Sequence, residues 1–161
     1  MSGSRFGRPL AKAGLAAIVA VALLAQPAAA TEPSSGSGTF VFTSMTPTGA
    51  RTADSNTIIT ATATGALSGA LTGTFTDELR QVLHADGTSE FHGTLTCTCT
   101  VQGMKGTVVL RFEGSGTGGS AGQFTVVSAS GNLEGLHGQG TFAQTSPAVA
   151  GTYEINMHRD P

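Results

Sequence analysis

The sequence lacks tryptophan, has two cysteines and carries little charge. Charged residues make up 11% of the 161 residues, and aromatic residues make up 6%. Two cysteines exclude a small domain held together by many disulfides. Eight Lys and Arg against ten Asp and Glu exclude the basic surface of a typical nucleic-acid-binding protein. The length allows one ordinary domain that can bury a core of its own.

Long apolar runs are also missing, except near the N-terminus. Residues 1–30 have the pattern of a cleaved export signal, with three basic residues, an apolar run from Leu15 to Ala25 and small residues up to Ala30. The run is shorter than the roughly 20 residues of a spanning helix, which favours cleavage over a membrane anchor. We expect a protein that is secreted or held in the cell envelope or periplasm, with no membrane span after cleavage.

Cleavage after Ala30 would make the domain mildly acidic. Three of the eight basic residues lie in the signal, so five would face ten acidic residues. This balance predicts no nucleic-acid partner and little attraction to anionic membranes.

After the signal, residues 31–37 are expected to be a flexible tether and residues 38–161 a single domain. Short alternating runs broken by Gly, Pro or Asp-Gly are typical of an all-β sandwich or barrel. Short connections favour an up-and-down order, and the segment 46–56 is expected to be a mobile loop. Eight strands are expected near Thr39–Met45, Thr57–Leu67, Leu71–Leu83, Glu90–Val101, Met104–Gly114, Gln123–Ser130, Gly138–Ala143 and Gly151–Met157.

The alternation within these strands predicts one apolar and one polar face. From Phe91 to Val101 every second residue is apolar or Gly, and His or Thr lies between them. This pattern fits an antiparallel sheet with one wet side, and closing the sheet removes its exposed edges. The sequence therefore predicts an eight-stranded antiparallel β-barrel, which is filled by side chains or holds one small ligand. The spacing in Phe75–Leu83 also suits a helix, but the Asp86-Gly87 turn that follows favours a strand.

Cys97 and Cys99 share the apolar face of one expected strand. Export favours a disulfide, but residues two apart in a regular strand lie about 6.6–6.8 Å apart at Cα. A disulfide brings the Cβ atoms to about 3.5–4.5 Å. This geometry favours two buried free thiols, and a strained disulfide is the alternative.

A polar patch could lie inside the barrel. If Phe75 faces inward, Asp77 and Gln81 share its face, and a buried carboxylate needs a partner. The Tyr153 hydroxyl is a candidate partner. The simpler alternative places Asp77 in water at a strand end or bulge. Asp77, Gln81, Phe112 and Tyr153 are the candidate ligand-pocket residues.

No motif predicts a metal, a cofactor or a catalytic residue. The four histidines, which are His84, His92, His137 and His158, lack the spacing of a zinc motif and are expected to be exposed. No nucleophile–base pair is evident, so catalytic residues stay unknown.

Three blocks of sequence resemble a known family. They are Gly38-Thr39-Phe40, the Asp86–Ser89 turn feeding Phe91–Val101, and Ser130–Phe142. From Gly38 to Asn156 the chain resembles a bacterial family of unknown function, DUF3224, with an allene oxide cyclase-like barrel. The resemblance implies a compact eight-stranded barrel, allows a small homo-oligomer and brings no established activity. No motif matches the enzyme after which the fold is named, so no catalytic residue is carried over.

The preferred functional hypothesis is a non-enzymatic exported barrel that binds a small apolar or amphipathic molecule. One alternative is a cofactor-free isomerase or cyclase acting inside the barrel. The other is an envelope interaction protein whose barrel is filled. A largely apolar cavity would favour the binding protein, a cavity with converging polar groups would favour the enzyme, and a filled interior would favour the interaction protein.

Overall fold

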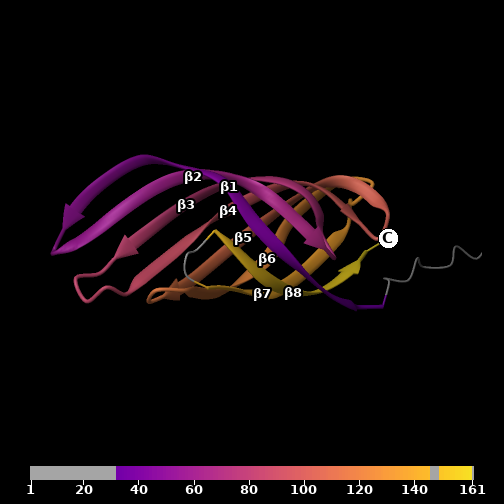
Figure 1. Ribbon diagram of the computed structural model, residues 1–161. Coiled ribbons are helices and arrows are strands. Elements are labelled where there is room, and N and C mark those ends of the chain that lie inside the picture. Colours follow the sequence, from indigo (N-terminus) through magenta and orange to yellow (C-terminus); the bar gives the residue numbers. More distant parts are fainter. Residues whose placement is uncertain (1–31, 146–148, 161) are drawn as a thin grey trace, which may run out of the picture.

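The chain forms a closed β-barrel. A computed structural model describes residues 32–145 and 149–160. Each antiparallel strand pairs with the next in sequence, and the last pairs with the first (Figure 1). Within the described residues no helix is long and apolar enough to cross a membrane. The strands are β1 (Ser34–Ala53), β2 (Asn56–Gly69), β3 (Thr72–Leu83), β4 (Ser89–Val101), β5 (Met104–Gly116), β6 (Ser120–Gly131), β7 (Leu136–Gln144) and β8 (Ala150–Arg159).

The predicted fold is confirmed, including the strand over Phe75–Leu83, but β1 is longer at both ends than expected. Ser34–Ser37 belongs to β1 and pairs with β8, so the expected tether at 31–37 is wrong from Ser34 onward. The expected loop at 46–56 is also wrong, because β1 continues to Ala53 and pairs with β2 there. Both segments are polar and contain Gly or Pro, yet pairing with a neighbouring strand satisfies their backbone groups. The expected signal at residues 1–30 lies outside the described residues.

The two ends of the barrel differ. One end, at the β2–β3, β4–β5 and β6–β7 connections, is tightly packed around side chains that are at most 2% exposed, among them Leu71, Cys97, Val101, Val108 and Leu133. The other end carries the β1–β2, β3–β4 and β5–β6 connections. The long β1–β2 hairpin extends at this end, on the left of Figure 1. Beyond Val41, β1 has no ladder to β8 among the described residues, so this part of the hairpin pairs with β2.

Glycines make room for the aromatic rings inside the barrel. Cross-strand pairs place an aromatic ring directly opposite a glycine, as in Phe112 and Gly93. A Cβ built on Gly93 would lie 2.5 Å from Cζ of Phe112, so the ring occupies the space of the missing side chain. This alternation of large and small residues fits rings into a narrow barrel. The same pairing joins Phe75 to Gly65, Phe91 to Gly114, Phe142 to Gly122, Phe124 to Gly140, Phe40 to Gly151 and Tyr153 to Gly38.

Candidate functional site

A cavity of about 380 Å³ lies inside the barrel. It extends from Leu71, near the packed end, to Gln81 and Ser89 at the opposite end. Its volume falls within the roughly 300–1,000 Å³ of small-molecule sites. Aromatic and aliphatic side chains make up most of its wall, and its polar side chains are Asp77, Gln81, Ser89, Ser120, Gln144 and Tyr153.

Phenylalanine rings form a continuous part of this wall. Phe91, Phe112 and Phe142 contact one another with ring centroids 6.0 to 6.4 Å apart. Phe42 continues the wall, with its centroid 5.5 Å from that of Phe75. Such contacts between ring edges and faces stabilise the rings in fixed positions beyond the effect of area burial. The wall is therefore an apolar surface whose rings hold one another in place.

Asp77 places a carboxyl group in this apolar wall. The residue lies in the middle of β3 and is 3% exposed. Its cross-strand partners are Ala63 on β2 and Leu95 on β4, which offer no side-chain donor. The Oδ1 atom has no hydrogen-bond partner among the described residues. Burial, with a smaller contribution from the charge of Glu78, raises the pKa of Asp77 from 3.8 to about 7.

The Tyr153 hydroxyl, by contrast, is already bound by backbone groups. It accepts a hydrogen bond from Leu71 N at 2.8 Å and lies 3.0 Å from Leu71 O and 3.1 Å from Ser68 O, to which it can donate. Burial raises the pKa of Tyr153, so the hydroxyl stays protonated at neutral pH. Tyr153 thus fixes the β2–β3 connection against β8. No hydrogen bond joins it to Asp77, so the expectation of that pair is wrong.

The structure brings the four candidate pocket residues together around one cavity. Asp77, Gln81, Phe112 and Tyr153 all line it. The alternative that placed Asp77 in water is wrong, because continuous pairing of β3 with β2 and β4 points its side chain inward. Sequence reasoning missed the other phenylalanines of the wall. These phenylalanines could have been found from the sequence, because Phe and Gly recur on the apolar faces of the expected strands. That recurrence also predicts pairs of a Phe and a Gly on neighbouring strands.

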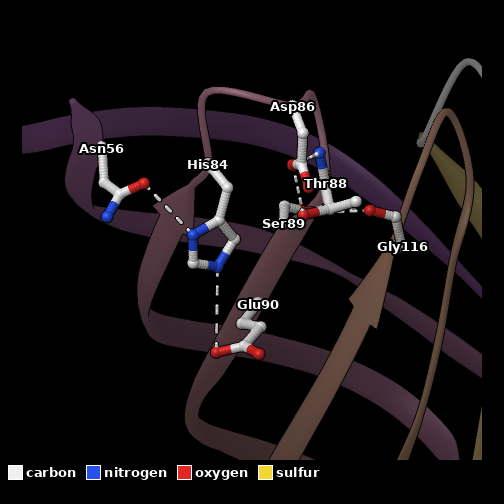
Figure 2. A network of polar contacts seen from close by, with 7 residues as sticks. All are labelled: Asn56, His84, Asp86, Thr88, Ser89, Glu90 and Gly116. Carbon is white, nitrogen blue, oxygen red and sulfur yellow. Dashed lines mark hydrogen bonds and ion pairs between the residues drawn. The ribbon is translucent and has the colours of Figure 1, made fainter.

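Polar contacts order the β3–β4 turn and the start of β4 at this end of the barrel (Figure 2). Asp86 accepts hydrogen bonds from Thr88 N at 2.9 Å and from Thr88 Oγ1 at 2.7 Å, and these bonds lower the pKa of Asp86. Ser89, which lines the cavity, donates to Gly116 O at 3.4 Å. The turn between β3 and β4 is thereby tied to the end of β5.

The histidines lie outside the cavity wall. His84 Nδ1 lies 3.2 Å from Asn56 Oδ1, and its Nε2 lies 3.9 Å from Glu90 Oε2 (Figure 2). His137 and His158 stack on each other at a centroid distance of 5.4 Å. His84 and His158 are only partly exposed, unlike the exposed state expected for all four. Within the described residues, no group of three or more His, Cys, Asp or Glu could hold a metal ion.

Cys97 and Cys99 form a disulfide, so the preference for free thiols is wrong. Their Cα atoms lie 5.3 Å apart, closer than the spacing of a regular strand, and this contraction permits the bond. The pairing of β4 with both neighbouring strands stays in register through this segment. Both cysteines are buried at the packed end, as their alternation with Leu95 and Val101 predicted.

Comparisons with known proteins agree with this architecture. The family model "Protein of unknown function (DUF3224)" matches residues 36–156. A crystal structure of a DUF3224-family protein of unknown function from Shewanella oneidensis MR-1 is similar, with a TM-score of 0.69 and 20% sequence identity over 81% of this chain and 99% of that chain. At this identity the likeness shows the fold alone. A search of curated proteins finds no match.

Proposed function

The chain belongs to the DUF3224 family of proteins of unknown function, and we propose that it is an exported barrel that binds a small apolar or amphipathic molecule. The observation that carries the proposal is the cavity of about 380 Å³ with its wall of phenylalanine rings. Small-molecule sites are mostly apolar, with a few polar groups that fix orientation. Asp77 and Gln81 are the polar groups of this kind.

Export is part of the same proposal. Its support is the pattern of residues 1–30 together with the Cys97–Cys99 disulfide. Disulfides persist in oxidising compartments and are rare in the reducing cytosol. The cavity weighs against the alternative of a filled barrel. The protein would act as a carrier or receptor in the envelope or the medium.

Native mass spectrometry of protein purified from the producing cells' secreted fraction tests ligand binding and export. We expect a mature chain starting at Thr31 together with a small molecule that is lost on denaturation. A chain that retains residues 1–30 would contradict the proposed export. A protein that carries no added mass would then be titrated with N-phenyl-1-naphthylamine, whose fluorescence rises in apolar sites.

Variants show whether such a probe binds in the cavity. Leu95 lines the cavity, and Leu95→Phe adds volume there, so we expect weaker binding. Thr96 is exposed on the outer face of the same strand, and Thr96→Phe serves as the matched control. Equal binding by both variants would place the probe elsewhere, and a wild-type protein that binds no probe would contradict the proposed function.

A second candidate function is a cofactor-free isomerase or cyclase. The observation that favours it is Asp77, whose pKa of about 7 suits a general acid or base at neutral pH. An enzyme would release a product of altered structure, whereas a binding protein returns its ligand unchanged. Incubation of the retained molecule with fresh protein, followed by mass and retention-time comparison, separates the two.

A further inference from the structure

We infer that the ligand of the barrel is a cationic amphiphile, with a hydrocarbon or aromatic body among the phenylalanine rings and a protonated amine bound to Asp77. This inference rests on the proposed function and specifies the ligand's chemistry. It starts from the buried carboxyl group. The cavity reaches Asp77, and Oδ1 of that carboxyl has no hydrogen-bond partner among the described residues.

Oδ1 of this carboxyl group lacks a donor among the residues that the structure describes. Its neighbours across the sheet are Ala63 and Leu95, which carry no charge. The charged residue next to it in the chain, Glu78, is exposed on the outer face of β3. A buried polar atom without a partner costs free energy, and a charged one costs more. Asp77 lines the cavity, so a ligand there that donates a hydrogen bond to its carboxyl group would lower this cost. An ammonium group would in addition stabilise the carboxylate.

The charges of the wall exclude the opposite type of ligand. No Lys, Arg or His is among the described residues that line the cavity. Tyr153 is the other titratable residue of the wall, and its hydroxyl is held by Leu71 and Ser68. A fatty acid or phosphate would therefore enter an apolar site that offers it a carboxyl group and no cation. Such a ligand would lose its hydration without an opposite charge.

The rings beside Asp77 suit a cation as well. Phe75 precedes Asp77 by two residues on the same face of β3, and the ring of Phe42 lies 5.5 Å from that of Phe75. The face of an aromatic ring attracts an ammonium group within about 6 Å, and the attraction grows when the site excludes water. The rings and Asp77 together form a wall that binds both parts of an amine-bearing amphiphile.

Three probes with the same hydrocarbon chain test the inference. Decylamine, decanol and decanoate are titrated into the full mature protein by displacement of N-phenyl-1-naphthylamine, at about pH 8. We expect decylamine to bind about tenfold or more tightly than decanol, the ratio that corresponds to one charge-assisted hydrogen bond. We expect decanoate to bind most weakly. Lowering the pH to about 5 should weaken decylamine binding, because a proton then competes for Asp77, and should leave decanol binding unchanged.

Two variants assign the preference to its residue. Asp77→Asn keeps the shape of the side chain and should remove the advantage of decylamine while decanol still binds. Glu78→Gln is the matched control on the outer face of the same strand and should keep the preference. Should Asp77→Asn fail to fold, the carboxyl ¹³C resonance of Asp77 in the wild-type protein provides the readout, because decylamine should hold it in the ionised form at pH 6.

The outcomes separate the inference from the proposed function. Decanol binding as tight as decylamine binding, or a preference that survives Asp77→Asn, would overturn the cationic ligand and leave the apolar binding site intact. Failure of all three probes and of the dye to bind would overturn both. Tightest binding by decanoate would reverse the assigned charge of the ligand.

Discussion

At the scale of single residues, Asp77 stands apart as a carboxyl group buried among apolar side chains, with 3% of its surface exposed. It sits between Ala63 and Leu95 in an apolar wall, and its raised pKa follows from that burial. Proteins retain such groups at functional sites more often than elsewhere, because an apolar residue of similar size would pack at lower cost. The cost of Asp77 can be measured separately from any ligand.

The pH dependence of stability should reveal this cost. The pKa of Asp77 is about 7 in the folded chain and close to 3.8 in the unfolded one. Between these two pH values, Asp77 is therefore protonated in the folded chain and ionised in the unfolded chain. The free energy of unfolding should therefore fall as the pH rises from about 4 to about 7, by up to about 4 kcal/mol, and stay level above that. Urea unfolding of the wild type and of Asp77→Asn at several pH values measures the difference.

The matched control for this experiment is Glu78→Gln. Glu78 is exposed on the outer face of β3, so its removal should leave most of the pH dependence in place. Parallel curves for the wild type and Asp77→Asn would mean that Asp77 ionises freely in the folded chain. The assignment of Asp77 to the apolar wall would then be wrong.

At the scale of elements, pairs of strands are joined by contacts between aromatic rings and glycines. In the β4–β5 pair the ring of Phe112 covers Gly93, and the ring of Phe91 covers Gly114. The paired glycine fixes the height of each ring in the barrel, and the rings in turn form the cavity wall. Any side chain in place of these glycines would displace a ring or separate the strands.

We predict that Gly93→Ala destabilises the fold by about 1–3 kcal/mol, the range for inserting a methyl group where atoms are already closely packed. A Cβ at this position would lie 2.5 Å from Cζ of Phe112 and would also approach the backbone carbonyl of Glu78, which cannot move away. Gly49→Ala is the control, because the nearest atom to its Cβ is the rotatable hydroxyl of Thr60 at 3.0 Å. Thermal unfolding followed by circular dichroism compares the two, and equal melting temperatures would contradict the pairing.

The strands could be predicted from the sequence because the alternation of apolar and polar residues shows which side chains share a face of the sheet. The segment Phe91–Val101 alternates without interruption, and β4 covers it in full. The same information did not decide the state of Asp77, because a polar residue in an apolar register reads equally well as a bulge. Nor did it decide the disulfide. The bond depends on a Cα separation of 5.3 Å, and alternation alone predicts the spacing of a regular strand.

At the scale of the whole molecule, closure of the barrel depends on the pairing of β1 with β8. These strands stand at opposite ends of the chain, so no local pattern shows that they meet. Ser34–Ser37 has the composition of a linker, yet it pairs with Met157 and the three residues before it. Side chains support this contact, since Ser35 Oγ donates to Asn156 Oδ1 at 2.6 Å. This segment is a strand because it pairs with β8, since its composition alone does not favour a strand.

Removal of this segment tests closure directly. We predict that a chain starting at Gly38 is less stable than one starting at Ser34 by about 2–4 kcal/mol, the scale of a few lost backbone hydrogen bonds. The loss should also expose the backbone of β8 from Glu154 to Met157, which faces Ser34–Ser37. Urea unfolding measures the first effect and amide hydrogen exchange of β8 the second. A chain starting at Thr31 is the control, and because Glu32 and Pro33 precede β1, it should match the chain starting at Ser34. Unchanged stability and unchanged exchange in the shorter chain would show that Ser34–Ser37 is the tether its composition suggests and that the barrel closes without it.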